Sequence, residues 1–451
     1  MPESSTAPIV LVSAVGLTRT LLPMAPRLSA LAGRGWSRPV LDCEPAVTCS
    51  AQATLLTGRP PRDHGIVGNG WLFRDTREIR FWQQSNALIQ SEPLYETARR
   101  RAADRGRSLR VAKLFWWYNQ GAEVDLSVTP KPLYGADGGK VFGIWGSPPE
   151  LPARLERLIG PFPFPSFWGP MAGLPATRWI ARCAAEVLSA DRPDLTLVYL
   201  PHLDYEPQRL GPSGCDMARL VGELDEAAAP LLDAAKAVGA RVWVFGEYGH
   251  SDVVRPVLPN RALRDAGMLA VRPGPYGDQL ETFQGRAFAV CDHQHAHVYV
   301  QRAEDLREVR DLLVALPGVD RAFIGEERAE IGLDHSRSGE IVLRAASDAW
   351  FAYPFWLDDA QAPDYARTVD IHRKPGYDPC ELFFDPSLTA PKIRAMRRLI
   401  QKKLGFRTLM DLIPLDPSIV RGSHGCPSES DDDRPVLIGD GPAPPPNGPW
   451  R

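Results

Sequence analysis

Residues 45–58 read Pro45-Ala-Val-Thr48-Cys-Ser-Ala-Gln-Ala-Thr-Leu-Leu-Thr57-Gly58, and the rest of the chain can be interpreted outward from them. A short apolar approach ends at Thr48, a helix-compatible stretch follows, and Thr57-Gly58 ends it. The free N–H groups and the positive dipole end at a helix start favour an anion. Thr48 is therefore either a plain helix cap or a reactive hydroxyl beside a bound anion.

Predicted strands and helices alternate along the chain before and after residues 45–58. Short apolar runs at 9–15, 195–200 and 241–245 predict buried strands, and 435–438 predicts a last short strand. The segments 21–35, 179–188 and 217–238 are typical of helices. This alternation predicts an α/β fold with a parallel sheet.

Polar residues follow three of the expected strands. Thr48, Asp204 and Glu247 each come directly after an apolar segment. Active groups gather beyond the carboxyl ends of parallel strands, so we expect these three residues to lie together. Asp204 and Glu247 could instead cap the elements that follow them.

Several blocks of the sequence resemble the nucleotide pyrophosphatase/phosphodiesterase branch of the alkaline phosphatase superfamily. They are Thr48 with Thr57-Gly58, His64-Gly65-Ile66 and Asn69; Asp204-Tyr-Glu-Pro-Gln208 with Gly211-Pro212; Gly246-Glu247-Tyr248-Gly249; and Gly422-Ser-His424-Gly425 with Gly441-Pro442. The resemblance implies an alkaline-phosphatase-like α/β fold. Its central, mostly parallel sheet is flanked by helices, with cap and insertion segments.

The resemblance also implies roles for individual residues. Thr48 would be the covalent nucleophile, and Asn69, 21 residues further on, would bind a phosphate oxygen, although a turn asparagine is the simpler interpretation. The metal positions of the family match Asp204, Gln208, Glu247 and His424, with Val15-Gly16 where the family has a first aspartate. Only Asp204 and His424 are unchanged, so the metal site is divergent.

A threonine hydroxyl does not ionise unaided at neutral pH, so it needs a cation or a base beside it. We expect a divalent metal as the cofactor, with one or two ions that are zinc or, alternatively, manganese. The expected reaction passes through a phospho-threonine at Thr48 and ends with hydrolysis of that intermediate.

Other histidines could replace the missing ligands. The run Asp292-His293-Gln-His295-Ala-His297 alternates with the period of a strand, which would place His293, His295 and His297 on one face. His335 and His372 each lie beside or near an aspartate. We choose His293 and His372 as metal ligands, although the sequence does not determine which of the five line the site. Arg373 and Lys374 are candidates to bind a substrate phosphate, or are two ordinary surface cations.

The chain of 451 residues is expected to form one alkaline-phosphatase-like domain over 1–442. An aromatic-rich cap is expected at about 71–173, an insertion at about 253–339, and a flexible proline-rich tail at 443–451.

Composition limits the partners. The formal charge of −3 gives no electrostatic reason to expect a nucleic-acid polymer or a membrane, and the basic runs 99–107 and 397–403 are interpreted as solvated helix faces. Seven scattered cysteines without a Cys-x-x-Cys pair argue against a disulfide framework. The beginning of the sequence lacks a basic leader pattern. We expect a cytoplasmic protein that acts on a small phosphoester, and the oligomeric state is left open.

Three functions are compatible with this pattern. The first is a hydrolase of phosphodiester or pyrophosphate bonds. The second is a phosphomonoesterase or phosphonate-cleaving relative in a biosynthetic pathway. The third is a catalytically silent protein that binds a phosphorylated ligand, which the loss of the first aspartate favours.

Overall fold

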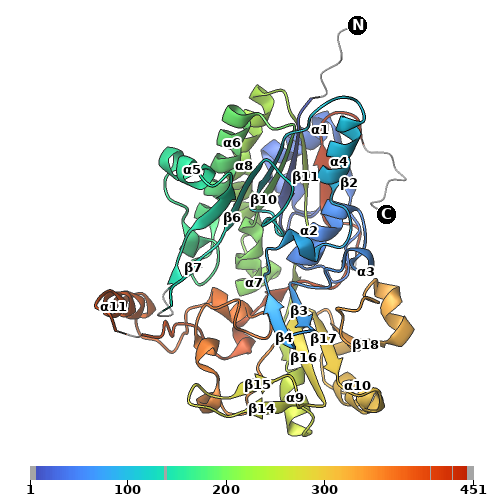
Figure 1. The fold of residues 1–451 in the computed structure, drawn as a ribbon, viewed down its shortest axis with the longest axis vertical. Coiled ribbons are helices and arrows are strands. Elements are labelled where there is room, and N and C mark those ends of the chain that lie inside the picture. The colour runs from blue at the N-terminus through green and yellow to red at the C-terminus, as the bar shows by residue number, and fades with distance from the viewer. Residues whose placement is uncertain (1–6, 137–139, 407, 429, 444–451) are drawn as a thin grey trace.

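A computed structural model describes residues 7–136, 140–406, 408–428 and 430–443. Its largest element is an eight-stranded sheet that is parallel through its centre (Figure 1). Antiparallel pairing occurs at β22, between β2 and β11, and at β9, which forms one edge. In spatial order the strands are β2 (Trp36–Pro39), β22 (Val436–Gly439), β11 (Arg241–Phe245), β1 (Ile9–Ala14), β10 (Leu195–Leu200), β5 (Val111–Leu114), β6 (Leu126–Pro130) and β9 (Ile144–Ser147).

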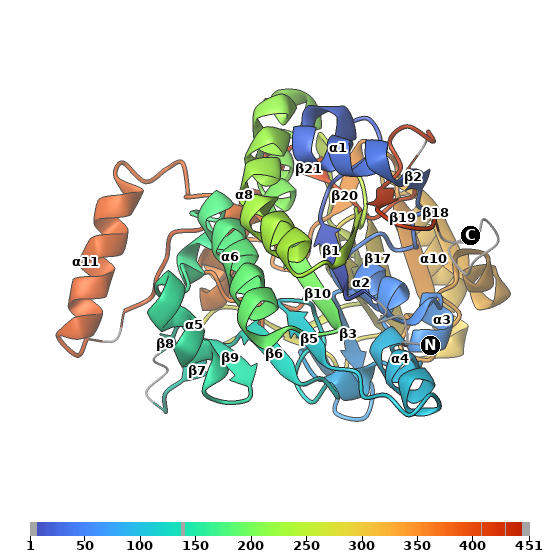
Figure 2. The ribbon, with the colours of Figure 1, turned by 90° about the horizontal axis from the view of Figure 1, so that it is seen from above.

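Helices cover both faces of this sheet because its strands are apolar on both sides. Val10 and Val12 of β1 pack with helices α6 (Leu174–Asp191) and α8 (Met217–Ala237), which lie on one face (Figure 2). Ile9 and Leu11 pack toward the opposite face with residues of α2 (Thr48–Thr57) and α4 (Leu94–Ala103). The sheet therefore holds the start of α2 rigidly near its carboxyl edge.

A second, antiparallel sheet lies below the first in Figure 1. Its order is β16 (Ala287–Asp292), β17 (His295–Val300), β19 (Ile341–Ala345) and β18 (Val319–Ile324). These strands form a separate apolar cluster with α9 (Pro259–Asp265) and α10 (Leu306–Val314) nearby.

The remaining elements are short or peripheral. The helices are α1 (Pro26–Arg34), α3 (Pro61–His64), α5 (Leu151–Ile159), α7 (Glu206–Leu210) and α11 (Pro391–Lys403). The strands are β3 (Gly70–Phe73), β4 (Glu78–Phe81), β7 (Leu133–Tyr134), β8 (Lys140–Val141), β12 (Ser251–Asp252), β13 (Arg255–Val257), β14 (Ala270–Arg272), β15 (Gln279–Glu281), β20 (Ala349–Phe351) and β21 (Gly422–Ser423).

The predicted mostly parallel α/β sheet is present, and β10 and β11 have the predicted bounds. Helix α2 ends at Gly58 with a φ of 64°, a conformation in which glycine has no steric penalty. The prediction of a strand directly before Thr48 is wrong. Residues 40–47 are irregular, because Ala46 donates its N–H to the Gly425 carbonyl instead of to a neighbouring strand.

Two further observations concern the C-terminal tail and membrane-spanning helices. The tail expected at 443–451 lies, from residue 444 onward, outside the described residues. Within the described ranges, no helix combines the length and the apolar character needed to span a bilayer.

Candidate active site

Thr48 is the first residue of α2 and is almost fully buried. Its hydroxyl oxygen lies 2.8 Å from the hydroxyl of Tyr248, and that hydroxyl donates to Asp204 Oδ1 at 3.2 Å. A tyrosine has one hydroxyl proton, so when it is given to Asp204 the Thr48 hydroxyl must donate to the Tyr248 oxygen. The proposed nucleophile is thereby joined to a carboxylate through one intervening hydroxyl.

Asp204, His250 and His424 converge beside this chain of hydroxyls. They come from three separate places: the turn after β10, the loop after β11, and the segment after β21. One ligand atom from each lies within 4.8 Å of those of the other two. The His250 ring nitrogen Nε2 is 3.2 Å from Asp204 Oδ1, and His424 Nε2 is 3.7 Å from it.

The chemistry of these residues fits a single divalent cation. His424 Nδ1 lies 2.7 Å from the Ala46 carbonyl, so Nδ1 carries the proton and Nε2 keeps its lone pair. Nε2 is buried and has no hydrogen-bond partner among the described residues, an arrangement that is costly unless a cation accepts the lone pair. Imidazole and carboxylate are also the ligands that zinc prefers in catalytic sites.

The charge states support this assignment. Burial alone would raise the pKa of Asp204, but its hydrogen bond to His250 and the nearby His424 lower it overall. Burial holds the pKa of His424 well below its ordinary value. The site thus presents an ionised carboxylate and a neutral imidazole, which are the protonation states that bind metal.

Glu247 and Val15, which the sequence analysis matched to family metal positions, do not fit another cation. Glu247 accepts hydrogen bonds from the Ser13 hydroxyl and from Gln52 Nε2, the latter at 2.8 Å. Burial raises its pKa to about 8, so at neutral pH it is mostly uncharged. Val15 offers no ligand atom, and the Tyr248 ring stacks on His424 with 3.8 Å between ring centres.

Asn69 lies next to the start of α2. Its Oδ1 accepts the Cys49 N–H at 2.9 Å, and its Nδ2 donates to Asp292 Oδ1 at 2.9 Å. Asn69 therefore satisfies one of the free N–H groups of the helix start, and Asp292 orients its amide. Burial raises the pKa of Asp292 to about 7. The phosphate-binding role of Asn69 stays a prediction.

Gln208 follows Asp204 by one helical turn and is fully buried. Its Nε2 donates to the Asp204 backbone carbonyl at 2.9 Å, and its Oε1 accepts the Tyr377 hydroxyl at 2.6 Å. Both ends of this amide are used within the protein. Gln208 braces the Asp204 segment and does not belong to the three-residue cluster.

The predicted single histidine strand is wrong, because the chain reverses direction within it. β16 ends at Asp292, and His293 occupies a tight turn with a φ of 58° before β17 begins at His295. His293 stacks between His424 and Tyr377, at 3.6 and 3.8 Å between ring centres. It therefore packs against the cluster without joining it.

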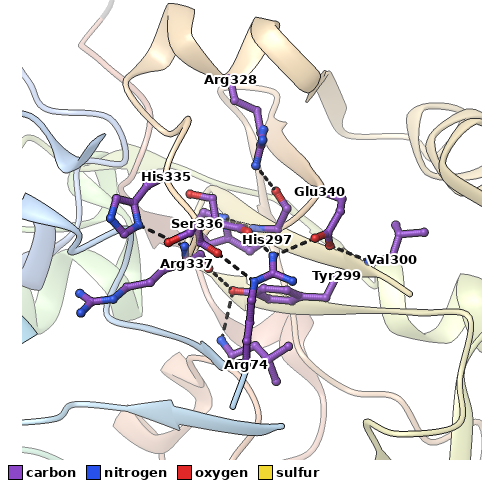
Figure 3. Close-up of polar contacts among 12 residues, drawn as sticks. Arg74, His297, Tyr299, Val300, Arg328, His335, Ser336, Arg337 and Glu340 are labelled. Carbon is purple, nitrogen blue, oxygen red and sulfur yellow. Dashed lines mark hydrogen bonds and ion pairs between the residues drawn. The ribbon is translucent and has the colours of Figure 1, made fainter. Parts of the chain in front are cut away.

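The other candidate histidines of this region have partners elsewhere. His295 Nε2 lies 3.0 Å from Glu44, His297 Nε2 lies 2.9 Å from the Val67 carbonyl, and His335 Nε2 lies 2.8 Å from Gln90. Figure 3 shows His297 and His335 within a polar network of the second sheet that also includes Arg74, Arg337 and Glu340. These histidines stabilise the insertion.

A cavity of about 220 Å³ opens onto Thr48 and Asp204. Aromatic side chains from the expected cap supply much of its lining, and Lys131, Lys140 and His372 also border it. The aromatic members are Trp82, Trp117, Phe142, Phe164, Phe167 and Trp168, joined by Tyr199 and Tyr205. Planar or apolar groups attached to a phosphate can pack against such a surface.

His372 reaches this cavity as a wall residue, with Nδ1 3.3 Å from the Phe81 carbonyl, and it lies outside the three-residue cluster. Arg373 and Lys374 are not among the lining residues. Arg373 is exposed near Asp364 and Asp370. Lys374 is buried between Asp378 at 2.7 Å and Glu381 at 2.8 Å, so its ammonium group is neutralised within the protein.

His250 and Tyr248 are the site residues whose roles the sequence analysis missed. Both follow β11 within a few residues of Glu247. The position of His250 shortly after a predicted strand, and close to Glu247, is the signal that could have indicated it.

Comparisons with known proteins identify the family and the fold. The family model for type I phosphodiesterase/nucleotide pyrophosphatase matches residues 9–378. No curated protein matches the chain. Among solved structures, phosphonoacetate hydrolase from Sinorhizobium meliloti 1021 superposes with a TM-score of 0.59 at 16% identity, over 97% of this chain and 91% of that one.

Murine ectonucleotide pyrophosphatase/phosphodiesterase 5 superposes with a TM-score of 0.56 at 14% identity, over 97% of this chain and 88% of that one. At these identities the likeness shows a shared alkaline-phosphatase-like fold. The family match extends over most of the chain and includes Thr48, Asn69, Asp204 and Glu247. The chain belongs to the type I phosphodiesterase/nucleotide pyrophosphatase family of the alkaline phosphatase superfamily.

Proposed function

We propose that this protein hydrolyses phosphodiester or pyrophosphate bonds, with Thr48 as the nucleophile beside a single divalent cation. The observation that carries the proposal is the Thr48 hydroxyl itself. It lies at a cavity, is hydrogen-bonded through Tyr248 to Asp204, and stands beside the cluster of Asp204, His250 and His424.

Asp204, His250 and His424 would hold the cation, which is Zn²⁺ or Mn²⁺. Once bound, it would supply positive charge that stabilises the negative charge developing on the phosphoryl oxygens. The remaining tasks belong to the chain. Tyr248 orients the Thr48 hydroxyl, and the Asn69 amide, which donates one N–H to Asp292, would donate its other N–H to a phosphoryl oxygen. The aromatic walls would exclude water and hold the organic group of the substrate.

The reaction proceeds in two balanced steps. In the first, Thr48 Oγ1 forms a bond to phosphorus while the bond from phosphorus to the leaving oxygen breaks, and the departing alcohol or phosphate takes up the threonine proton. In the second, water adds to the phosphorus of phospho-threonine, which restores the Thr48 hydroxyl and releases the phosphorylated product.

The test compares a diester, bis-(p-nitrophenyl) phosphate, with a monoester, p-nitrophenyl phosphate, in the presence of Zn²⁺ or Mn²⁺. Thr48→Ala should lower diester turnover by on the order of 10⁴-fold or more, because it removes the attacking atom. Thr57→Ala, at the far end of the same helix, is the matched control and should keep turnover.

Two results would contradict the proposal. Equal diester turnover in Thr48→Ala and the unmodified protein would exclude Thr48 as the nucleophile. Nucleotide binding without turnover of either ester, under every metal condition, would indicate a silent binding protein. A preference for the monoester would be compatible with Thr48 as the nucleophile but would indicate a phosphomonoesterase instead of a phosphodiesterase.

A further inference from the structure

Helix α11 has a composition unlike the rest of the chain. Its sequence Pro-Lys-Ile-Arg-Ala-Met-Arg-Arg-Leu-Ile-Gln-Lys-Lys contains six basic residues and no acidic one, although the whole protein has a charge of −3. None of its described side chains is buried. Figures 1 and 2 both show α11 standing away from the rest of the molecule.

The apolar residues of α11 form one continuous face. Successive residues of a helix turn by about 100°, so Ile393, Met396 and Ile400, with Leu404 directly after the helix, fall within a narrow arc. These side chains are exposed, with 71% of the surface of Ile393 and 63% of that of Met396 open to solvent. An apolar helix face of this size normally covers a core or a partner.

The helix is attached by its opposite side. Arg394 and Arg398 pair with Asp411, and by helical geometry both arginines point away from the arc of Ile393 and Ile400. The attachment therefore directs the apolar face outward. Arg397 and Lys403 flank that face, one on each side.

The β7–β8 hairpin adds a second exposed apolar surface. Leu133 is 68% exposed and Val141 is 64% exposed, and Tyr134 and Phe142 beside them are also exposed. In both ribbon views the hairpin and α11 lie toward the same side of the molecule. Lys131 and Lys140 lie in or next to this hairpin, and neither has a carboxylate partner among the described residues.

We propose that α11, together with the β7–β8 hairpin, seats the protein on an anionic lipid surface. An exposed apolar face flanked by cations, on a helix without acidic residues, matches a membrane interface, where apolar side chains enter the acyl boundary and cations meet lipid phosphates. This inference does not rest on the proposed hydrolase function. It differs from the expectation of no membrane partner, which followed from the overall charge of −3, and from the interpretation of the basic run 397–403 as a solvated helix face.

The experiment is co-sedimentation of the full-length protein with unilamellar vesicles. One set contains equal parts phosphatidylglycerol and phosphatidylcholine, and the other contains phosphatidylcholine alone. We expect binding to the anionic set, weakened by 0.5 M salt. Each basic residue near such a surface contributes about a fivefold gain in partitioning, so Arg397→Glu with Lys403→Glu should lower binding at least about 25-fold.

Met396→Ser with Ile400→Ser should abolish the binding that persists at high salt, because it removes the apolar contribution. The matched controls are Arg101→Glu on α4 and Leu158→Ser on α5, which change an exposed cation and an exposed leucine elsewhere and should leave binding unchanged. Thermal unfolding of each variant establishes that it is folded.

Three results would overturn the proposal: no binding to anionic vesicles at low salt, equal binding by the α11 variants, or loss of binding in the controls alone. Sedimentation velocity without lipid gives a fourth. Concentration-dependent dimers that Met396→Ser with Ile400→Ser dissociates would show that a second copy of the chain covers this face.

Discussion

Tyr248 is the residue that most clearly separates this site from a two-metal centre. Its hydroxyl lies between Thr48 and Asp204, and its ring covers one side of His424. Directly after Glu247, the chain thus has a side chain that can hold the proposed nucleophile in place through a hydrogen bond.

Tyr248→Phe tests this role. The variant keeps the ring stacked on His424 but leaves the Thr48 hydroxyl without its partner, so we expect kcat to fall about 10- to 100-fold, the value of one hydrogen bond to a charged network. Steady-state kinetics with bis-(p-nitrophenyl) phosphate measures the effect. The control is Tyr95→Phe on α4, which removes a hydroxyl that donates to Asn86. An unchanged kcat in Tyr248→Phe would contradict the positioning role.

Lys113 gives a prediction about pH. It is buried in β5 with its ammonium group donating to the Tyr118 carbonyl, and burial lowers its pKa from 10.5 to about 7. Between these two values the unfolded chain binds more protons than the folded protein, so this residue makes stability rise with pH by up to about 1.4 kcal/mol per pH unit.

Lys113→Met should therefore show a flatter dependence of the free energy of unfolding on pH between 7 and 10. Urea unfolding of both proteins at four pH values measures the difference. Parallel curves for the two proteins would show that Lys113 is protonated in the folded state throughout this range.

At the residue scale, the sequence was informative where a motif specifies the position. Thr48, Asp204 and His424 meet in the structure, and all three lie in segments that resemble the family. His250 lies in no segment that matches a family metal position, and its proximity to Asp204 depends on the tertiary contact between the loop after β11 and the turn after β10. The buried pairing of Lys374 likewise depends on tertiary contacts with Glu381.

At the scale of the elements, Gly422 and Gly222 allow a matched comparison of two glycine-to-alanine substitutions. Gly422 of β21 lies so close to the Pro207 carbonyl that an added Cβ would sit 1.9 Å from its oxygen, whereas an added Cβ at Gly222 in α8 meets nothing within 4 Å. Gly422→Ala must displace β21, which directly precedes His424.

We expect Gly422→Ala to lower the free energy of unfolding by about 1–3 kcal/mol, as an overpacked substitution does. Gly222→Ala should raise it by about 0.5–1 kcal/mol, because alanine loses less backbone entropy in a helix. Urea denaturation measures both. A neutral Gly422→Ala would mean that β21 is loosely held, and metal affinity measured alongside would then be unchanged.

Secondary structure was predictable where the hydrophobic pattern of a segment ends at residues that interrupt a helix or strand. β10, β11 and α8 match their predicted ranges because each is a long apolar or amphipathic run with clear ends. The run from Asp292 to His297 was predicted to alternate as part of one strand, whereas it contains the turn of the β16–β17 hairpin. Alternation continues through the turn at His293 and Gln294, so periodicity alone cannot reveal the reversal there.

At the scale of the whole molecule, the cation should stabilise the fold. Asp204, His250 and His424 come from segments that are brought together only by the complete tertiary structure, so a cation binds the folded state in preference. At a free concentration 100 times its Kd, Zn²⁺ or Mn²⁺ should add about 2.7 kcal/mol of stability.

Thermal unfolding after treatment with a chelator, with and without added metal, measures this effect. His424→Gln should remove most of the metal-dependent rise in Tm, and His335→Gln, which changes a histidine paired with Gln90 outside the cluster, should keep it. A rise of equal size in His424→Gln would place the bound metal elsewhere.

The antiparallel strand β22 has a consequence for the order in which the protein matures. It is inserted between β2 and β11, and His424, which completes the cluster, lies 12 residues before its first residue, Val436. A chain still emerging from the ribosome thus displays Thr48 and Asp204 long before the last imidazole is available. The proposed cation site can therefore form only after the segment that carries His424 has been synthesised and β22 has paired between β2 and β11.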